Sequence, residues 1–330
     1  MAGNFYEAFE EKYRGDRDLI KSRLRVYLPF VEPLLSAYDG EMASAIDLGC
    51  GRGEWLELLK ESGFEGYGVD LDEGMLSACR DRGLRVAAGD AVETLKALPD
   101  ESQVAVSGFH IAEHLQFSHL QVLVQESLRV LKPGGVLILE TPNPENIVVA
   151  TTIFYLDPTH QRPIPPLLLS FLPEFYGFGR TKILRLQETV SLSDEGALSM
   201  EQVLYCASAD FAVVAQKSAP ERIFDTLGQA FASEHGISLA TLVRKYDRHR
   251  EEAARAAATE SQAAMTKALQ AENMALQAES MALAAVAKAQ EAELALRHVQ
   301  EMMQSIFNSR SWRATAPLRW LAAQTKWFRS

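Results

Sequence analysis

Residues 45–59 read AIDLGCGRGEWLELL, where three glycines alternate with other residues between a short apolar run and an amphipathic helical pattern. The glycines are Gly49, Gly51 and Gly53, and Asp47 lies two residues before the first. A glycine turn between a strand and a helix lets a ligand approach the backbone and meet the amides at the start of the helix. This stretch predicts an α/β fold with a ligand site at the end of its first strand.

Strand and helix patterns continue to alternate along residues 44–139. We expect strands at 44–48, 67–71, 85–89, 104–109 and 136–140, helices from Glu54, over 74–81 and over 119–131, a short helix after 85–89, and a turn at LKPGG (131–135). Two further strands are expected at 182–188 and 211–217. Such alternation with short connections predicts a parallel sheet with helices on both faces.

The acids at the ends of the first three strands indicate the ligand. The spacing G-x-G-x-G differs from the dinucleotide fingerprint G-x-G-x-x-G, and Asp47 would repel a pyrophosphate. Asp47 suits a ligand with a cationic near end, such as S-adenosylmethionine with its ammonium and sulfonium groups. Asp70 can accept hydrogen bonds from ribose hydroxyls, and Asp90 can accept one from the adenine amino group.

At these residues the sequence resembles the class I S-adenosylmethionine-dependent methyltransferases, over about residues 44–218. The matching motifs are AIDLGCGRG, GYGVDLDEGML, AAGDA, HIAEHL and LRVLKPGGVLILETPNP. The resemblance implies a Rossmann-like, seven-stranded sheet with S-adenosylmethionine as cofactor, and we expect no metal. The residues expected at the donor site are Asp47, Gly49, Cys50, Gly51, Gly53, Asp70, Leu71, Met75, Asp90, Ala91 and Phe109.

Two flanking segments narrow the resemblance. Residues 5–35 and YLDPTHQRPIPP (155–166) resemble the methyltransferase part of the O-antigen chain-terminating enzymes, which cap a growing lipopolysaccharide chain. This implies methylation of a bacterial surface polysaccharide or lipid-linked glycan, on a sugar hydroxyl or a phosphate. No kinase-like motif follows residue 220, so a phosphate acceptor would need a separate kinase as partner.

Four side chains are candidate catalytic groups. His110, Glu113 and His114 follow the fourth strand, and His160 lies in the loop DPTHQRP. A sugar hydroxyl benefits from a general base, which any of these could supply, whereas a structural role for each is the alternative. For an anionic acceptor, the candidate clamp in the N-terminal segment is Arg14, Arg17 and Arg23, together with Lys21. A solvated helix face balanced by nearby acids is an equally open interpretation of these cations.

The chain divides by composition into five parts. We expect a helical leader covering the donor site (1–43), the methyltransferase domain (44–219), a helical connector (220–249), a coiled coil (250–304) and a basic, Trp-rich tail (305–330). In the fourth part, ALQAENM, ALQAESM and ALAAVAK repeat at heptad spacing, which predicts a homo-oligomer through this helix. A lone solvated helix is the alternative, because the heptad register is imperfect.

The tail differs in charge from the rest of an acidic chain. The net charge is −11, yet residues 305–330 hold five basic residues, no acid and three of the four tryptophans. Such a segment favours a membrane interface or a groove on a partner, such as a polymerising glycosyltransferase. The acidic body excludes nucleic acid. Three scattered cysteines and no apolar leader predict a cytoplasmic protein, peripheral at the inner membrane if the tail binds lipid.

Two other functions fit part of the sequence. A small-molecule O-methyltransferase acting on quinone-like compounds has a similar stretch to HIAEHL, but it gives no reason for the coiled coil or the tail. A coiled-coil scaffold with a non-catalytic S-adenosylmethionine-binding domain explains both, although the intact donor motifs argue against it.

Overall fold

The computed structural model describes residues 15–38, 40, 42–188 and 198–327. Within these residues one sheet has the order β3-β2-β1-β4-β5-β7-β6. Its strands are β1 (Ser44–Leu48), β2 (Glu65–Asp70), β3 (Val86–Ala88), β4 (Gln103–Phe109), β5 (Leu131–Pro142), β6 (Arg180–Leu186) and β7 (Asp210–Gln216). The pairs among β1 to β5 are parallel, whereas β7 is antiparallel to both of its neighbours. The predicted seven-stranded, Rossmann-like fold is confirmed.

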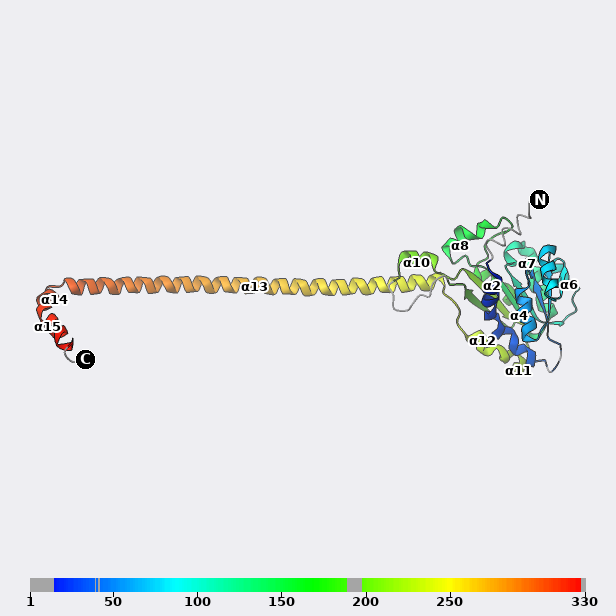
Figure 1. Cartoon of the computed structure of the whole chain (residues 1–330), viewed down its shortest axis with the longest axis horizontal. Coiled ribbons are helices and arrows are strands. Elements are labelled where there is room, and N and C mark those ends of the chain that lie inside the picture. The colour runs from blue at the N-terminus through cyan, green and yellow to red at the C-terminus, as the bar shows by residue number, and fades with distance from the viewer. Residues whose placement is uncertain (1–14, 39, 41, 189–197, 328–330) are drawn as a thin grey trace. The chain divides into compact units, whose positions relative to one another are not determined.

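Helices cover both faces of the sheet (Figure 1). They are α4 (Glu54–Ser62), α5 (Glu73–Asp81), α6 (Ala91–Ala97), η3 (Ala112–His114), α7 (Phe117–Val130), α8 (Ile147–Thr151), η4 (Ile153–Leu156), α9 (Pro166–Tyr176) and α10 (Met200–Tyr205). Side chains alternate between the faces along β5, because Val136 and Ile138 pack with α4 whereas Leu137 and Leu139 pack with α7. This alternation gives the domain two apolar layers, one on each side of the sheet.

Two elements differ from the sequence prediction. LKPGG is not a separate turn, since α7 ends at Val130 and β5 begins at once, with an irregularity in its pairing to β4. The backbone of Gly134 is held at the end of β7, because its N–H donates to the carbonyl of Lys217, just after the strand, and its carbonyl accepts from the Gln216 side chain. Helix α9 was not predicted, since Pro173 lies inside it and prolines precede it.

The leader is helical from residue 17, in four short segments. They are α2 (Arg17–Leu24), η1 (Arg25–Tyr27), α3 (Leu28–Val31) and η2 (Glu32–Ser36). Pro29 and Pro33 lie in the first turns of α3 and η2, where proline is tolerated, so each begins a segment rather than kinking a longer helix. Tyr27, Phe30 and Leu34 are fully buried against the sheet domain.

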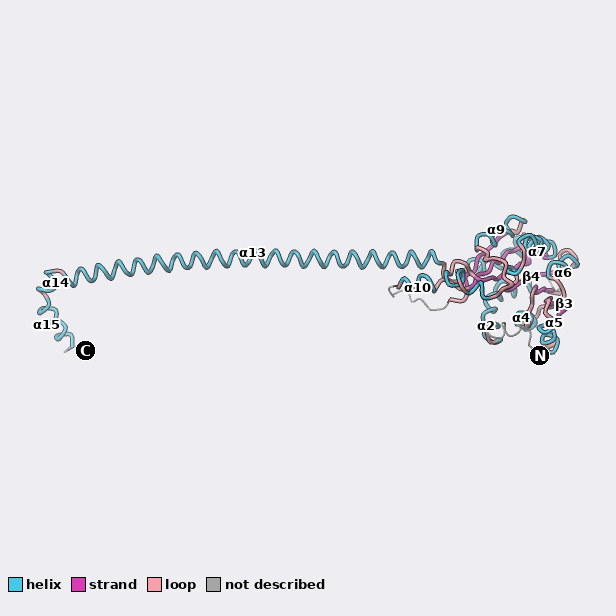
Figure 2. Tube along the Cα trace, turned by 90° about the horizontal axis from the view of Figure 1, so that it is seen from above, coloured by secondary structure: helices cyan, strands magenta, loops and turns pink. Residues whose placement is uncertain are grey.

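The chain forms two compact units, which divide between Arg250 and Glu251. The first unit also contains α11 (Glu221–Phe224), η5 (Asp225–Leu227), α12 (Gly228–Ala232) and the start of α13 (Leu239–Asn308). There Leu242 is buried with Val203 in a small apolar cluster. Helix α13 runs without interruption for 70 residues (Figure 2).

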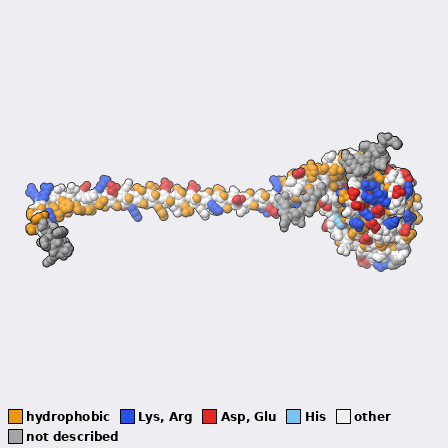
Figure 3. Space-filling model, in the orientation of Figure 1, with side chains coloured by type: hydrophobic (Ala, Val, Ile, Leu, Met, Phe, Trp, Pro, Cys, Tyr) orange, Lys and Arg blue, Asp and Glu red, His pale blue; other side chains and the backbone are white. Residues whose placement is uncertain are grey.

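The second unit is almost entirely exposed and helical. Its apolar side chains lie along α13 in contact with solvent (Figure 3), and α14 (Arg310–Ala314) and α15 (Ala316–Trp327) follow it. The heptad leucines Leu269, Leu276 and Leu283 are 61%, 58% and 67% exposed. None of the helices in the described ranges combines the length and the hydropathy that crossing a membrane requires.

Candidate active site

The glycine loop lies between β1 and α4, at the carboxyl edge of the parallel strands. Gly49, Gly51 and Gly53 all adopt positive φ, with Gly53 at 77°. A Cβ on Gly53 would lie 2.6 Å from a methyl carbon of Leu84, so both its conformation and its packing require glycine. No side chain caps α4, which leaves amides of its first turn available to an anionic group such as a carboxylate.

Two acidic side chains hold this loop: Asp70 bridges it to the end of β2, and Asp47 is buried beneath it. The Asp70 carboxylate accepts hydrogen bonds from Gly51 N at 2.8 Å and Asp72 N at 2.9 Å, and so ties the glycine loop to the end of β2. Each of its oxygens retains a lone pair that a ribose hydroxyl can use. Asp47 is 2% exposed and accepts from Ser107 Oγ at 2.7 Å, so it supports the loop from beneath.

The other expected donor residues surround the same edge. Leu71 is 79% exposed after β2, Met75 is half-buried on α5, Ala91 is buried at the start of α6, and Phe109 is half-buried at the end of β4. Asp90 is exposed and caps α6, accepting from Glu93 N at 3.0 Å. The side chain of Cys50 instead faces the core, so any contact of this residue with a donor would involve its backbone.

Trp55, in the first turn of α4, has an indole N–H without a hydrogen-bond partner in the described residues, and the sequence prediction did not assign this residue to the site. Its side chain is 2% exposed, and its ring lies 5.6 Å from that of Phe109 and 6.1 Å from that of Tyr27. A buried N–H without a partner is costly unless a ligand or water satisfies it, so Trp55 is a candidate contact for a polar ligand.

On the other side of Phe109, the end of β4 brings His110 to two acids. His110 Nδ1 lies 3.1 Å from Glu113 Oε1, and His110 Nε2 lies 3.5 Å from Glu140 Oε1. Burial lowers the pKa of His110, but these two carboxylates raise it further, and the net pKa is well above the usual value. A raised pKa favours the protonated ring, which argues against His110 acting as a general base, so that role stays a prediction.

The sequence prediction missed four residues around His110, which are Tyr27, Glu140, Thr141 and Asp210. Glu140 on β5 accepts a short hydrogen bond from Tyr27 Oη of the leader, and Thr141 Oγ1 donates to Glu113 Oε2 at 2.8 Å. Asp210 begins β7 opposite Pro142, and burial raises its pKa to about 7 although His110 opposes the shift. An acidic residue at the start of a strand was the only sequence signal for Asp210.

His114 and His160 meet on the far side of Glu113, although they belong to separate segments of the chain. Their ring centroids are 4.7 Å apart, and one potential ligand atom from each lies within 4.8 Å of a Glu113 carboxylate oxygen. Burial lowers the pKa of His114, so its ring is neutral at neutral pH. The structure thus brings together all four predicted catalytic side chains.

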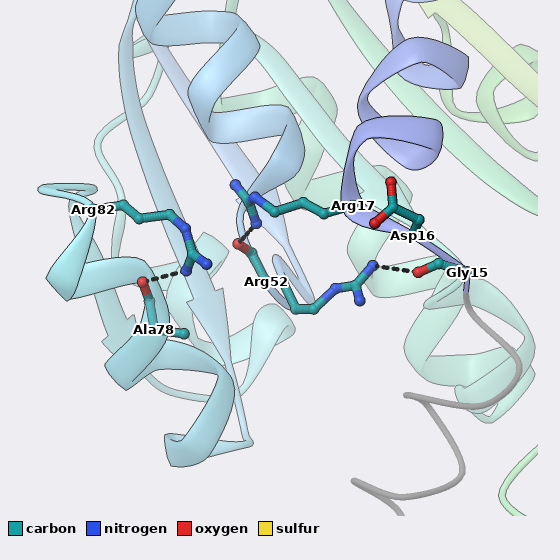
Figure 4. A pocket seen from close by; sticks show the side chains of 6 residues that line it. All are labelled: Gly15, Asp16, Arg17, Arg52, Ala78 and Arg82. Atoms are coloured by element: carbon teal, nitrogen blue, oxygen red, sulfur yellow. Dashed lines mark hydrogen bonds between the residues drawn. The ribbon is translucent and has the colours of Figure 1, made fainter.

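The described members of the predicted anion clamp have protein partners of their own, and the clamp itself stays a prediction. Arg14 lies outside the described residues, and Arg17 is held by Glu57 at 2.7 Å and by the carbonyl of Arg52 at 2.6 Å. Arg17, Arg52 and Arg82 line an open pocket of about 440 Å³, and Arg52 belongs to the glycine loop (Figure 4). Arg23 is exposed, and its charge acts on Asp210. The cations of α2 therefore serve mainly to pair the leader with α4.

Comparison with known proteins agrees with this geometry. A family model described as a methyltransferase domain matches residues 46–139. A probable S-adenosylmethionine-dependent methyltransferase of Mycolicibacterium smegmatis is 33% identical over 133 residues, which cover 40% of this chain and 51% of that protein. The ubiquinone biosynthesis O-methyltransferase of Methylococcus capsulatus is 34% identical over 105 residues, 30% of this chain and 43% of that protein.

The matches thus span about half or less of the length of these curated relatives. A crystal structure of an S-adenosylmethionine-dependent methyltransferase from Archaeoglobus fulgidus extends the likeness to a whole protein. It is 34% identical with a TM-score of 0.56, and the alignment covers 65% of this chain and 100% of that one. The glycine loop, the acids at the strand ends and this full-length match lead to one conclusion: the chain belongs to the class I S-adenosylmethionine-dependent methyltransferases.

Proposed function

We propose that this protein transfers a methyl group from S-adenosylmethionine to a hydroxyl oxygen. The observation that carries the proposal is the acidic cluster beside the donor loop, in which Glu113, Glu140 and Asp210 surround His110. Carboxylates favour an acceptor that donates hydrogen bonds, and they repel an anionic one. A hydroxyl acceptor is therefore favoured over a phosphate.

The charges of the leader support the same choice. Arg17 and Lys21 are engaged by Glu57 and Glu61 of α4, which leaves them poorly placed to hold a phosphate. An anionic acceptor would need further cations beside His110 to offset the acidic side chains of this cluster. Of the predicted clamp residues in the described part of the chain, Arg17 is paired with Glu57, whereas the charge of Arg23 acts on Asp210.

The donor supplies a methyl carbon that its sulfonium has already activated, so the protein chiefly positions the two reactants. Trp55, Asp70 and the amides of α4 would hold the donor. The acceptor oxygen loses its proton as it gains the methyl group, and Asp210 is suited to receive that proton because its pKa is about 7. His110, whose raised pKa favours the protonated ring, would hold the neighbouring carboxylates in place.

The acceptor class that we propose is a glycan or lipid-linked glycan, supported by the resemblance of the leader and of residues 155–166 to O-antigen chain-terminating enzymes. The test is transfer of labelled methyl from S-adenosylmethionine to extracted lipid-linked glycans, with and without phosphatase treatment. Transfer that survives phosphatase and is lost in Asp70→Ala supports the proposal. Transfer that phosphatase abolishes would show a phosphate acceptor and contradict it.

A quinone-like small molecule is the second candidate, favoured by the match to the ubiquinone biosynthesis O-methyltransferase. Assaying polyprenylated catechols in parallel separates the two acceptor classes. If only the catechols are methylated, the glycan proposal fails while the O-methyltransferase proposal stands.

We also propose that α13 pairs with a second copy of the chain. Its heptad leucines are more than half exposed in one chain, and a coiled coil would bury them. The basic, Trp-containing helices α14 and α15 would then bind an anionic membrane surface or a glycosyltransferase, as their composition favours. Removing residues 251–330 should leave methyl transfer to a soluble acceptor intact and abolish self-association, whereas loss of transfer would contradict this division of roles.

A further inference from the structure

We propose that Glu113, His114 and His160 form a binding site for a divalent transition-metal ion. Each side chain offers one ligand atom, and these atoms lie within 4.8 Å of one another. Two imidazoles and one carboxylate, with positions left open for other ligands, make up a donor set typical of zinc, iron and cobalt sites. The proposal concerns metal binding itself and does not depend on which acceptor is methylated.

The hydrogen bonding of His160 fixes which nitrogen is free to bind the ion. Its Nδ1 lies 2.6 Å from the carbonyl oxygen of Phe154, which can only accept, so Nδ1 carries the proton. In the neutral ring Nε2 then has an unshared electron pair. A backbone carbonyl that orients a histidine in this way is the usual outer partner of a metal ligand.

The hydrogen bonds of Thr159 fix which ring nitrogen of His114 carries the proton in the same way. The Thr159 hydroxyl has one proton, which it donates to Asp157 Oδ1 at 2.6 Å. Its contact of 2.8 Å with His114 Nδ1 must therefore be accepted from the ring, so His114 also keeps its free electron pair on Nε2. Both histidines thus have the tautomer that a metal ion requires, set by partners outside the ligand group.

Glu113 completes the site with a carboxylate that is fully buried and fixed. His110 Nδ1 lies 3.1 Å from Oε1 and Thr141 Oγ1 donates to Oε2 at 2.8 Å, and each oxygen retains a second electron pair for an ion. Glu113 is also tied to the loop of His160, because its carbonyl accepts from Gln161 N at 2.8 Å. The helix η3 and the loop that carries His160 are therefore already joined before any ion binds.

An ion bound about 2.1 Å from each ligand atom would draw the three side chains slightly together. It would lie at the edge of the sheet where β4 and β5 end, on the acceptor side of Phe109. If the proposed function holds, such an ion is placed to bind the acceptor oxygen and to lower the pKa of its hydroxyl.

The test is titration of the full-length, untagged protein with Co²⁺ after dialysis against a chelator, followed by visible absorption and by competition with Zn²⁺. We expect one ion per chain with the absorption bands of nitrogen-coordinated cobalt. His160→Ala should weaken binding by at least about 100-fold. Thr159→Val, which removes only the partner of His114 Nδ1, should weaken it by about 10- to 100-fold. His298→Ala on the exposed surface of α13 is the matched control and should leave affinity unchanged.

Calorimetric binding of S-adenosylhomocysteine to each variant shows that its fold is intact, since the donor loop is separate from the metal ligands. Unchanged cobalt affinity in folded His160→Ala, or the absence of one-to-one binding in the parent protein, would overturn the proposal. Metal titration and S-adenosylhomocysteine binding do not depend on methyl transfer. Failure of the metal proposal is therefore distinguishable from failure of the proposed function.

Discussion

Replacing Tyr27 with phenylalanine tests whether the leader is held to the sheet through a buried charge. Tyr27 is fully buried, and its hydroxyl donates to Glu140 on β5, which is 5% exposed. The variant keeps the ring and removes this hydrogen bond, so Glu140 loses a donor that water cannot fully replace. A hydrogen bond to a charged group contributes about 1.5–3 kcal/mol. A loss of about 2 kcal/mol lowers the melting temperature of a domain of this size by about 4–8 °C.

Tyr38→Phe is the matched control, because Tyr38 Oη donates to the neutral carbonyl of Pro133 at 3.0 Å. Its expected cost is smaller, about 0.5–1.5 kcal/mol. Both variants are made in a background in which the tail tryptophans Trp312, Trp320 and Trp327 are phenylalanine, so that the fluorescence of Trp55 alone reports urea unfolding of the sheet domain. If Tyr27→Phe is no less stable than Tyr38→Phe, the bond to Glu140 does not anchor the leader and the reasoning is wrong.

Three further outcomes are expected. Asp70→Asn should weaken S-adenosylhomocysteine binding by about 30-fold or more in calorimetry, because hydrogen bonds to a charged carboxylate become bonds to a neutral amide. Asp72→Asn is the control, and an equal loss of affinity in both variants would contradict the assignment of Asp70 to the donor site. Asp210 keeps its proton up to about pH 7 when folded, against an ordinary pKa of 3.8, so unfolding free energy should fall as pH rises from about 4 to 7. Between pH 5 and pH 8, the free energy of unfolding measured in urea should fall less in Asp210→Asn than in the parent protein. The titratable and charged groups that face Asp210 are His110, Glu140, Glu113 and Arg23. Replacing Leu269, Leu276 and Leu283 with glutamine should shift sedimentation equilibrium toward the monomer, and an unchanged mass would exclude pairing through these positions.

The donor loop was predictable because its requirements are local. Gly49 and Gly53 need positive φ, and Asp70 follows directly after a strand, so residues near in sequence fix the geometry. Asp90 illustrates the limit of such reasoning. It does cap a helix, as its residue type favours, and capping leaves its position beside the adenine site open rather than excluding it.

Prediction of the acceptor-side residues required the direction of each strand, which the sequence pattern does not encode. In an all-parallel sheet, a residue that begins a strand lies at the edge opposite the ligand site. Because β7 is antiparallel, its first residue Asp210 lies opposite Pro142, at the same edge as His110. Similarly, the acids that pair with Arg17 are Glu54 and Glu57 on α4 rather than acids of the leader, and only tertiary packing brings them together.

The bond between Tyr27 and Glu140 joins segments 113 residues apart, and Tyr27 lies outside the span 46–139 that the methyltransferase family shares. His160 and Asp210 lie outside that span too. The donor loop thus lies within the span that the family model matches, whereas Tyr27, Glu140, His160 and Asp210 of the acceptor side lie outside it. The leader and the loop after β5 can therefore be exchanged to alter the acceptor side while the glycine loop and Asp70, which lie within the matched span, are left unchanged.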